Sequence, residues 1–317
     1  MKMEEINDEK EILFRMNQLR GVLSFVVMLS HIWGYTGLVF LVPFNKIVTI
    51  AVSFFFFLSG YGMVNSFKEK EYYLRKIFRV KIPFLLWMAL IAYIFGAILE
   101  RILLPYGVRI NAFLPLSISK FLISTNWYVY ELIGFYIVFF LIMRLIKEKY
   151  QLKVLAIISV MAFILLYYSG VVEAYYNSII GFWFGMLCGR HRCVELMDRY
   201  KKGYLLGGCG LILSFVGMFA LDHSSIVFAV IRNFAAVGAI IIVLYIVRYL
   251  NVNNMLMRYL SRISPEIYFY HMPIALLFSF ILKNSIIYAI VVIVASVGVA
   301  ALVNPLNQRV QKLIKGA

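Results

Sequence analysis

Long apolar runs constrain this chain more than any other feature of its sequence. Each of the ten runs approaches the roughly 20 residues that an α-helix needs to cross a bilayer. The runs are 18–41, 46–66, 82–104, 126–146, 152–169, 173–190, 203–220, 226–247, 264–282 and 285–304. Of the 317 residues, 63% are hydrophobic and 15% are charged, against about 45–50% and 25% in soluble proteins. The sequence therefore predicts an all-α fold, a polytopic membrane bundle of about ten transmembrane helices.

The basic residues predict how this bundle is oriented. If the N-terminus is cytoplasmic, the segments on that side hold 25 of the 31 Lys and Arg residues, and the outside loops hold five. Such a bias predicts that both termini lie in the cytoplasm. Because the cations lie in short loops between apolar runs, the net charge of +16 is a topology signal, and we expect no nucleic-acid partner.

The chain is predicted to hold one membrane domain between two short tails. We expect residues 1–17 to be a cytoplasmic tail, either disordered or an amphipathic surface helix, 18–304 to be the membrane domain, and 305–317 to be a second cytoplasmic tail. The three cysteines lack metal-ligand spacing, so no metal site is predicted. Glycines at 181, 185 and 189 repeat every fourth residue, which predicts a helix-packing ridge.

Arg20 and His31 form the most informative polar pair. Eleven residues of α-helix make about three turns and a rise of about 16 Å, so the two side chains share one helix face. Arg20 then lies at the cytoplasmic surface and His31 lies deep in the bilayer. Ionisable groups at that depth are costly and usually functional. The pair predicts an anion held at the surface and proton chemistry inside, although a packed histidine bonded to a backbone carbonyl is the alternative.

A second basic group, Arg75, Lys76 and Arg79, precedes the third apolar run on the predicted cytoplasmic side. Guanidinium groups bind phosphate oxygens bidentately, so these residues are candidates for binding a phosphate-bearing donor. A basic inside loop also follows from the positive-inside rule alone, and the sequence leaves both interpretations open.

Two further sets of polar residues lie inside apolar runs. Glu131 and Arg232 are predicted at similar depth near the outer side, where they either form a structural ion pair or flank an acceptor in a wet cavity. Tyr268 and His271 are three residues apart and share a face of the ninth run. They are candidates for a binding site, or for a polar contact within the bundle.

Five stretches of this sequence resemble motifs of the acyltransferase-3 family of integral-membrane acyltransferases, and they occur in the same order along the chain. They are 17–21 with His31, 53–61, 75–79 with Pro83, 127–131 with Tyr136, and 264–271. One departure is Asn17, where many relatives have Asp; its effect is not predicted.

The resemblance implies an O-acyltransferase that moves acetyl groups to sugars of the bacterial envelope. It implies His31 as the catalytic residue with Arg20 beside it, and a role for Tyr268 and His271 near the donor thioester. It also implies acetyl-CoA as a donor substrate, with no permanently bound cofactor. Whether His31 is a base or a transient acyl carrier stays open. The implied partners are acyl-CoA, membrane lipid and an envelope polysaccharide or lipid-linked sugar. The implied location is the bacterial inner membrane, as a multi-pass protein.

Two other classes of function are weighed against this one. A transporter or flippase for a polysaccharide or lipid-linked product would use the same polar residues as a conduit, and broken helices in corresponding halves would favour it. A noncatalytic sensor or scaffold would require neither Arg20 nor His31. The acceptor sugar, the acyl group and the oligomeric state are not predicted from the sequence.

Overall fold

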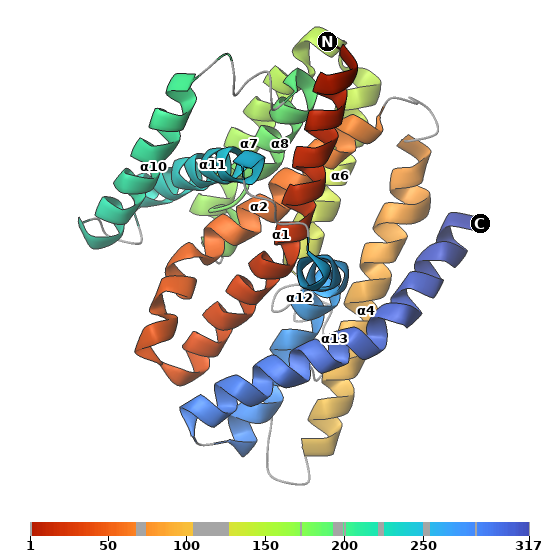
Figure 1. Ribbon diagram of the computed structural model, residues 1–317, viewed down its shortest axis with the longest axis vertical. Coiled ribbons are helices and arrows are strands. Elements are labelled where there is room, and N and C mark those ends of the chain that lie inside the picture. Colours follow the sequence, from red (N-terminus) through yellow and green to blue (C-terminus); the bar gives the residue numbers. More distant parts are fainter. Residues whose placement is uncertain are drawn as a thin grey trace. The chain divides into compact units, whose positions relative to one another are not determined.

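The computed structural model describes residues 2–67, 74–103, 127–171, 173–192, 199, 201–220, 225–249, 254–282 and 284–316, and within these ranges every regular element is helical. The ten long elements are α1 (Lys2–Thr36), α2 (Val42–Ser66), α4 (Ile82–Leu103), α6 (Trp127–Leu145), α7 (Gln151–Tyr168), α8 (Ile180–His191), α10 (Lys201–Ala220), α11 (Ile226–Tyr249), α12 (Met255–Ile281) and α13 (Ser285–Gly316) (Figure 1). Each predicted run overlaps one of these helices, although the run 173–190 meets α8 only from Ile180. The overlap confirms the all-α class.

Among the described residues, six helical segments are long and apolar enough to cross a membrane, which makes the chain a multi-pass membrane protein. They are Val39–Ser66, Leu74–Ile98, Trp127–Leu145, Glu148–Tyr168, Ile226–Val247 and Ser285–Gly316. Among the remaining helices, α8 has only 12 residues. The apolar parts of α1 and α12 carry charged and imidazole side chains that lower their hydropathy. The count of ten spans and the cytoplasmic termini therefore stay predictions.

The chain divides into two compact units. The first contains Met1–Arg20, Thr49–Tyr73 and Phe135–Arg258, and the second contains Gly21–Val48, Leu74–Gly134 and Tyr259–Ala317. The boundary after Arg20 falls within the continuous helix α1. Both predicted tails continue helices, since α1 begins at Lys2 and α13 ends at Gly316.

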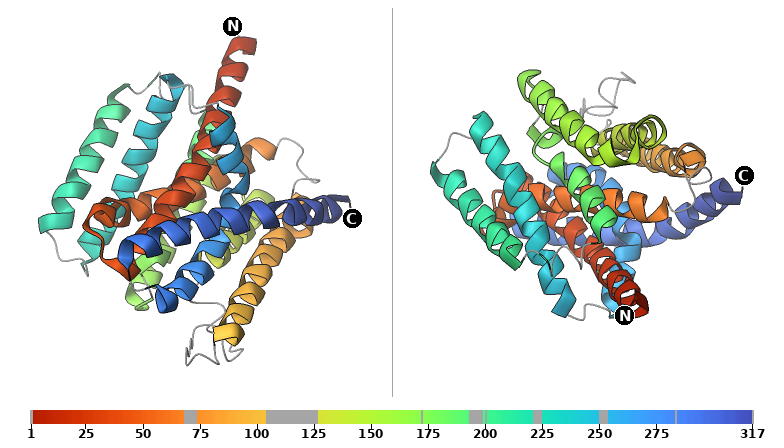
Figure 2. Two further views of the ribbon diagram at one scale, coloured as in Figure 1. Left: turned by 60° about the horizontal axis from the view of Figure 1, so that its bottom comes forward. Right: turned by 90° about the horizontal axis from the view of Figure 1, so that it is seen from above.

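In the first unit, glycines allow the backbones of α2 and α8 to pack in close contact. A Cβ atom on Gly60 would collide with the carbonyl oxygen of Phe182, and one on Gly185 would collide with that of Phe57. Gly181 meets the backbone of α2 in the same way. The predicted packing ridge is therefore confirmed. In the same unit, α10 and α11 lie side by side (Figures 1 and 2).

In the second unit, the C-terminal half of α1 packs along α12 in a nearly constant register. A Cβ on Gly21 would lie 2.7 Å from Leu260 Cβ, and Ser24 Oγ donates a 3.1 Å hydrogen bond to Ser264 O. Paired positions differ by 239 and then 240 residues, so the two helices run in the same direction. This register brings His31 level with His271.

Prolines in α12 remove backbone donors from this packed helix. The N–H missing at Pro265 would have reached the carbonyl of Ser261. Ser264 Oγ donates a 2.9 Å hydrogen bond to that carbonyl instead. The side chain thus lets α12 continue through Pro265 toward His271.

Candidate functional site

Two imidazole rings meet between α1 and α12. The ring centroids of His31 and His271 are 5.2 Å apart and their planes are inclined by 33°. The contact follows from the register set by Gly21 and Ser24. The sequence treated these histidines as separate candidates, and the structure brings them into one site.

The two histidines differ in their hydrogen bonds. His271 Nδ1 lies 2.9 Å from the carbonyl oxygen of Ile267. Because a carbonyl can only accept, Nδ1 carries a proton, and in the neutral ring Nε2 holds the lone pair. Within the described ranges, buried Nε2 has no hydrogen-bond partner. The packed histidine bonded to a carbonyl, which the sequence offered as an alternative for His31, is therefore found at His271.

Aromatic and acidic side chains extend the histidine pair. The Tyr268 ring lies 6.1 Å from the His271 ring and 5.0 Å from the Tyr128 ring, measured between centroids. Glu131 interacts electrostatically with Tyr268. Both Glu131 carboxylate oxygens are buried and make no hydrogen bond with the described part of the chain. The cluster thus joins a proton-accepting pair to a buried acid, groups suited to binding and deprotonating a hydroxyl.

Arg20 belongs to the first unit, where it lies among residues from two other helices. It interacts electrostatically with Tyr136 of α6, whose hydroxyl also hydrogen-bonds the side chain of Ser59 on α2. All three residues lie in the stretches that carry the family resemblance.

The basic group of the second unit lies at the entrance to α4. Arg75 and Arg79 are exposed and Lys76 is half-buried. Arg79 lies in η2 (Ile77–Lys81), a short π-helix that packs against α13. Such bulges are frequent at functional sites, and Arg79 within this one is exposed.

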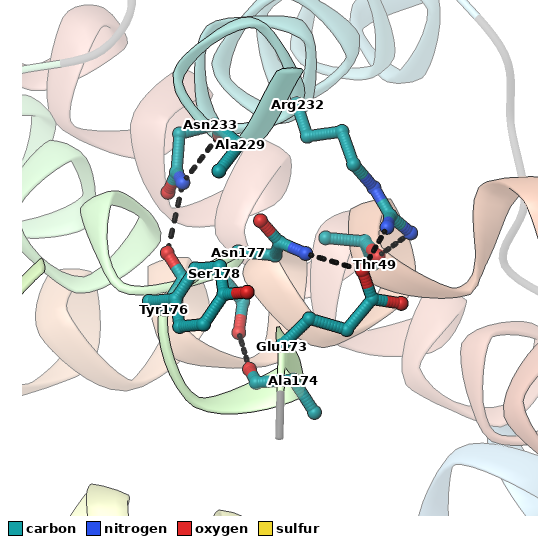
Figure 3. A network of polar contacts seen from close by, with 9 residues as sticks. All are labelled: Thr49, Glu173, Ala174, Tyr176, Asn177, Ser178, Ala229, Arg232 and Asn233. Carbon is teal, nitrogen blue, oxygen red and sulfur yellow. Dashed lines mark hydrogen bonds and ion pairs between the residues drawn. The ribbon is translucent and has the colours of Figure 1, made fainter. Parts of the chain in front are cut away.

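Arg232 on α11 pairs with a carboxylate that the sequence analysis did not single out. Arg232 Nη1 lies 3.1 Å from Glu173 Oε2, and Nη2 lies 2.6 Å from Thr49 Oγ1 (Figure 3). Asn177 Nδ2 donates to the same Glu173 oxygen. An ion pair with Glu131 was one of two alternatives that the sequence left open for Arg232; the structure instead gives Arg232 the Glu173 carboxylate of its own unit. The sequence placed Glu173 at the start of a span, but α8 begins only at Ile180, and Glu173 lies in the preceding turn.

The Arg232 contacts predict an asymmetric effect of mutation on stability. The Arg232 side chain is 12% exposed and that of Glu173 is 52% exposed. We expect Arg232→Ala to destabilise the protein by roughly 1–3 kcal/mol, because it also leaves the Thr49 hydroxyl without its donor. We expect Glu173→Ala to cost less, since solvent already reaches this carboxylate. Thermal unfolding in detergent measures both effects; equal losses, or a larger loss for Glu173→Ala, would contradict the asymmetry.

Comparison with known proteins identifies the family. The family model described as an acyltransferase domain, which represents the acyltransferase-3 family, matches residues 13–304. No curated protein and no solved structure matches the chain. The matched range contains the histidine pair, Arg20, the 75–79 group and Glu131. Since it covers most of the sequence, the chain belongs to the acyltransferase-3 family of membrane acyltransferases.

Proposed function

We propose that this membrane acyltransferase moves an acetyl or similar short acyl group from cytoplasmic acyl-CoA to a hydroxyl of an extracytoplasmic or lipid-linked sugar. The protein would act as an O-acetyltransferase in the bacterial inner membrane and modify an envelope polysaccharide. The observation that carries the proposal is the contact between His31 and His271 in a chain of this family.

His31 is the base in this proposal. Its ring nitrogens make no hydrogen bond with residues in the described ranges, whereas His271 is fixed by the Ile267 carbonyl. Ring nitrogens that make no such hydrogen bond with the described residues are available to an acceptor hydroxyl, and neutral imidazole accepts a proton near pH 7. His271 positions His31 through the ring contact.

The proposed reaction forms one ester bond and breaks one thioester bond. The acceptor oxygen attacks the thioester carbonyl carbon while its proton passes to His31. The tetrahedral intermediate then expels the thiolate of coenzyme A, which takes a proton from the imidazolium and leaves as the thiol. Both products are neutral at the reacting atoms, and His31 returns to its starting form.

The charged residues have separate roles in this proposal. Arg20, Arg75, Lys76 and Arg79 bind phosphates of the donor from the cytoplasm. Glu131, through its buried carboxylate beside Tyr268, accepts hydrogen bonds from the acceptor sugar. Arg232 has a structural role, since its contacts with Glu173 and Thr49 fix α11 to α2 and the turn before α8.

The O-acetyl content of envelope glycans tests the proposed function. We expect deletion of the gene to remove an O-acetyl group from one envelope glycan, and the wild-type gene to restore it, as measured by mass spectrometry of released glycans. Unchanged acylation of every envelope glycan in the deletion strain would refute the proposal.

Replacement of His271 tests its positioning role. We expect His271→Gln to lower kcat by roughly 10²-fold with little change in donor affinity, because donor contacts lie elsewhere while the His31 ring loses its neighbour. Acyl-transfer kinetics and CoA binding measure the two quantities. His191→Gln, an exposed histidine at the end of α8, is the control. A loss confined to protein stability, with kcat retained in the folded fraction, would contradict this role.

A further inference from the structure

A polar cavity of about 310 Å³ lies between α12 and α13, away from the histidine pair. Its volume is at the lower end of the range for small-molecule sites. The lining residues are Phe84, Arg262, Pro265, Glu266, Asn304, Asn307, Gln308, Gln311, Lys312 and Lys315. All of them belong to the second unit.

Amide side chains build the inner wall of this cavity around a buried carboxylate. Glu266 Oε1 accepts 3.0 Å hydrogen bonds from Asn304 Nδ2 and from Asn307 Nδ2. Trp87 Nε1 donates to Asn307 Oδ1 at 3.0 Å, and Gln308 Nε2 donates to Asn304 Oδ1 at 2.8 Å. The network joins α4, α12 and α13, so the packing of these helices fixes the inner wall of the cavity.

Cations surround the mouth of the cavity. Arg262, Lys312 and Lys315 line it and are exposed, against the single buried carboxylate of Glu266. Three cations against one carboxylate give the lining a net charge of +2, and two amide hydrogen bonds already hold Glu266 Oε1. Lys315 Nζ also reaches Gln311 Oε1 at 3.3 Å. An anion entering the mouth would meet one guanidinium and two ammonium groups, the donors that bind phosphate oxygens.

We propose that this cavity binds a phosphate group. Two sources carry this chemistry at the predicted cytoplasmic face, namely the nucleotide end of acyl-CoA and the headgroup of an anionic lipid. The first source rests on the proposed function, and the packing of η2, which carries Arg79, against α13 favours it. Arg79 and the cavity would then bind different phosphates of one donor.

Binding measurements in phosphatidylcholine nanodiscs separate the two sources. Adenosine 3′,5′-bisphosphate is the first probe, titrated calorimetrically against the wild-type protein and the Arg262→Gln and Lys312→Gln variants. We expect each variant to weaken its binding about tenfold. Arg309→Gln is the matched control, because it removes an equal charge from the same part of α13 outside the cavity lining. The second probe is phosphatidylglycerol, whose retention by the same proteins is read by native mass spectrometry.

Each result has one interpretation. Weaker bisphosphate binding in the two variants but not in the control supports the site with the donor as its source. Selective loss of phosphatidylglycerol, with bisphosphate binding unchanged, supports the site with lipid as its source. If the Arg262→Gln and Lys312→Gln variants weaken binding of neither probe more than Arg309→Gln does, the phosphate site is refuted. These arms require no acyl transfer, so a protein that binds the probe but acylates no glycan would refute only the proposed function.

Discussion

Replacement of His31 by Ala is expected to lower acyl transfer by roughly 10²- to 10⁴-fold, the range that general acid–base catalysis contributes. A sugar hydroxyl is a weak nucleophile until its proton leaves. Removal of the His31 imidazole leaves the His271 ring of the pair, whose Nδ1 is bound to the carbonyl oxygen of Ile267. That ring cannot occupy the position of His31 without breaking its own hydrogen bond. The measurement is the initial rate of acyl transfer in membranes that contain equal amounts of each protein.

His191→Ala is the matched control for His31→Ala. His191 is an exposed histidine at the end of α8, so we expect its replacement to leave the rate within about twofold, as for surface substitutions that make no catalytic contact. Thermal unfolding of both variants separates a catalytic loss from a folding loss. A His31→Ala protein with the wild-type rate would exclude His31 as the base.

Replacement of Gly60 by Ala is expected to have the largest effect on stability. A methyl group there would meet the carbonyl oxygen of Phe182 and lie 3.1 Å from Met186 N, both backbone atoms of α8. Backbone cannot move aside as a flexible side chain can, so α2 and α8 must separate. Overpacking of this kind costs roughly 1–3 kcal/mol and sometimes more. We expect a lower melting temperature and less monodisperse protein in detergent.

Gly62, two residues further along α2, provides the control for Gly60. A Cβ atom there has no neighbour within 4 Å. Because Ala is a better helix former than Gly by about 1 kcal/mol, Gly62→Ala should leave the melting temperature unchanged or raise it. Equal destabilisation by both substitutions would contradict the proposed packing of α2 against α8.

Sequence periodicity predicted much of the fold because the bilayer restricts the choice of structure. Apolar runs near 20 residues can only be helices in lipid, and within the described ranges each predicted run overlaps a helix. The glycine ridge was also predictable, since small residues at every fourth position mark close helix contacts. The number of crossings was harder to fix, because the polar side chains that suit α1 and α12 to chemistry also weaken their membrane signal.

Contacts between distant residues lay beyond the sequence. Similar predicted depth suggested Glu131 as the partner of Arg232, but depth says nothing of rotation about the membrane normal. The carboxylate of Glu173 reaches Arg232 because the chain turns before α8. The contact of His31 with His271 depends in the same way on the register between α1 and α12. Gly21 and the Ser24–Ser264 hydrogen bond set that register, and neither was identifiable without the structure.

Transfer of isotope-labelled acetyl from acetyl-CoA to envelope glycan tests the central claim most directly. Inside-out membrane vesicles that contain the wild-type, His31→Ala or His191→Ala protein are supplied with carbon-13 acetyl-CoA, and released glycans are analysed by mass spectrometry. The account predicts labelled O-acetyl esters with the wild-type and His191→Ala proteins and almost none with His31→Ala. Equal labelling with His31→Ala, or unlabelled glycans in vesicles of the wild-type protein, would contradict it.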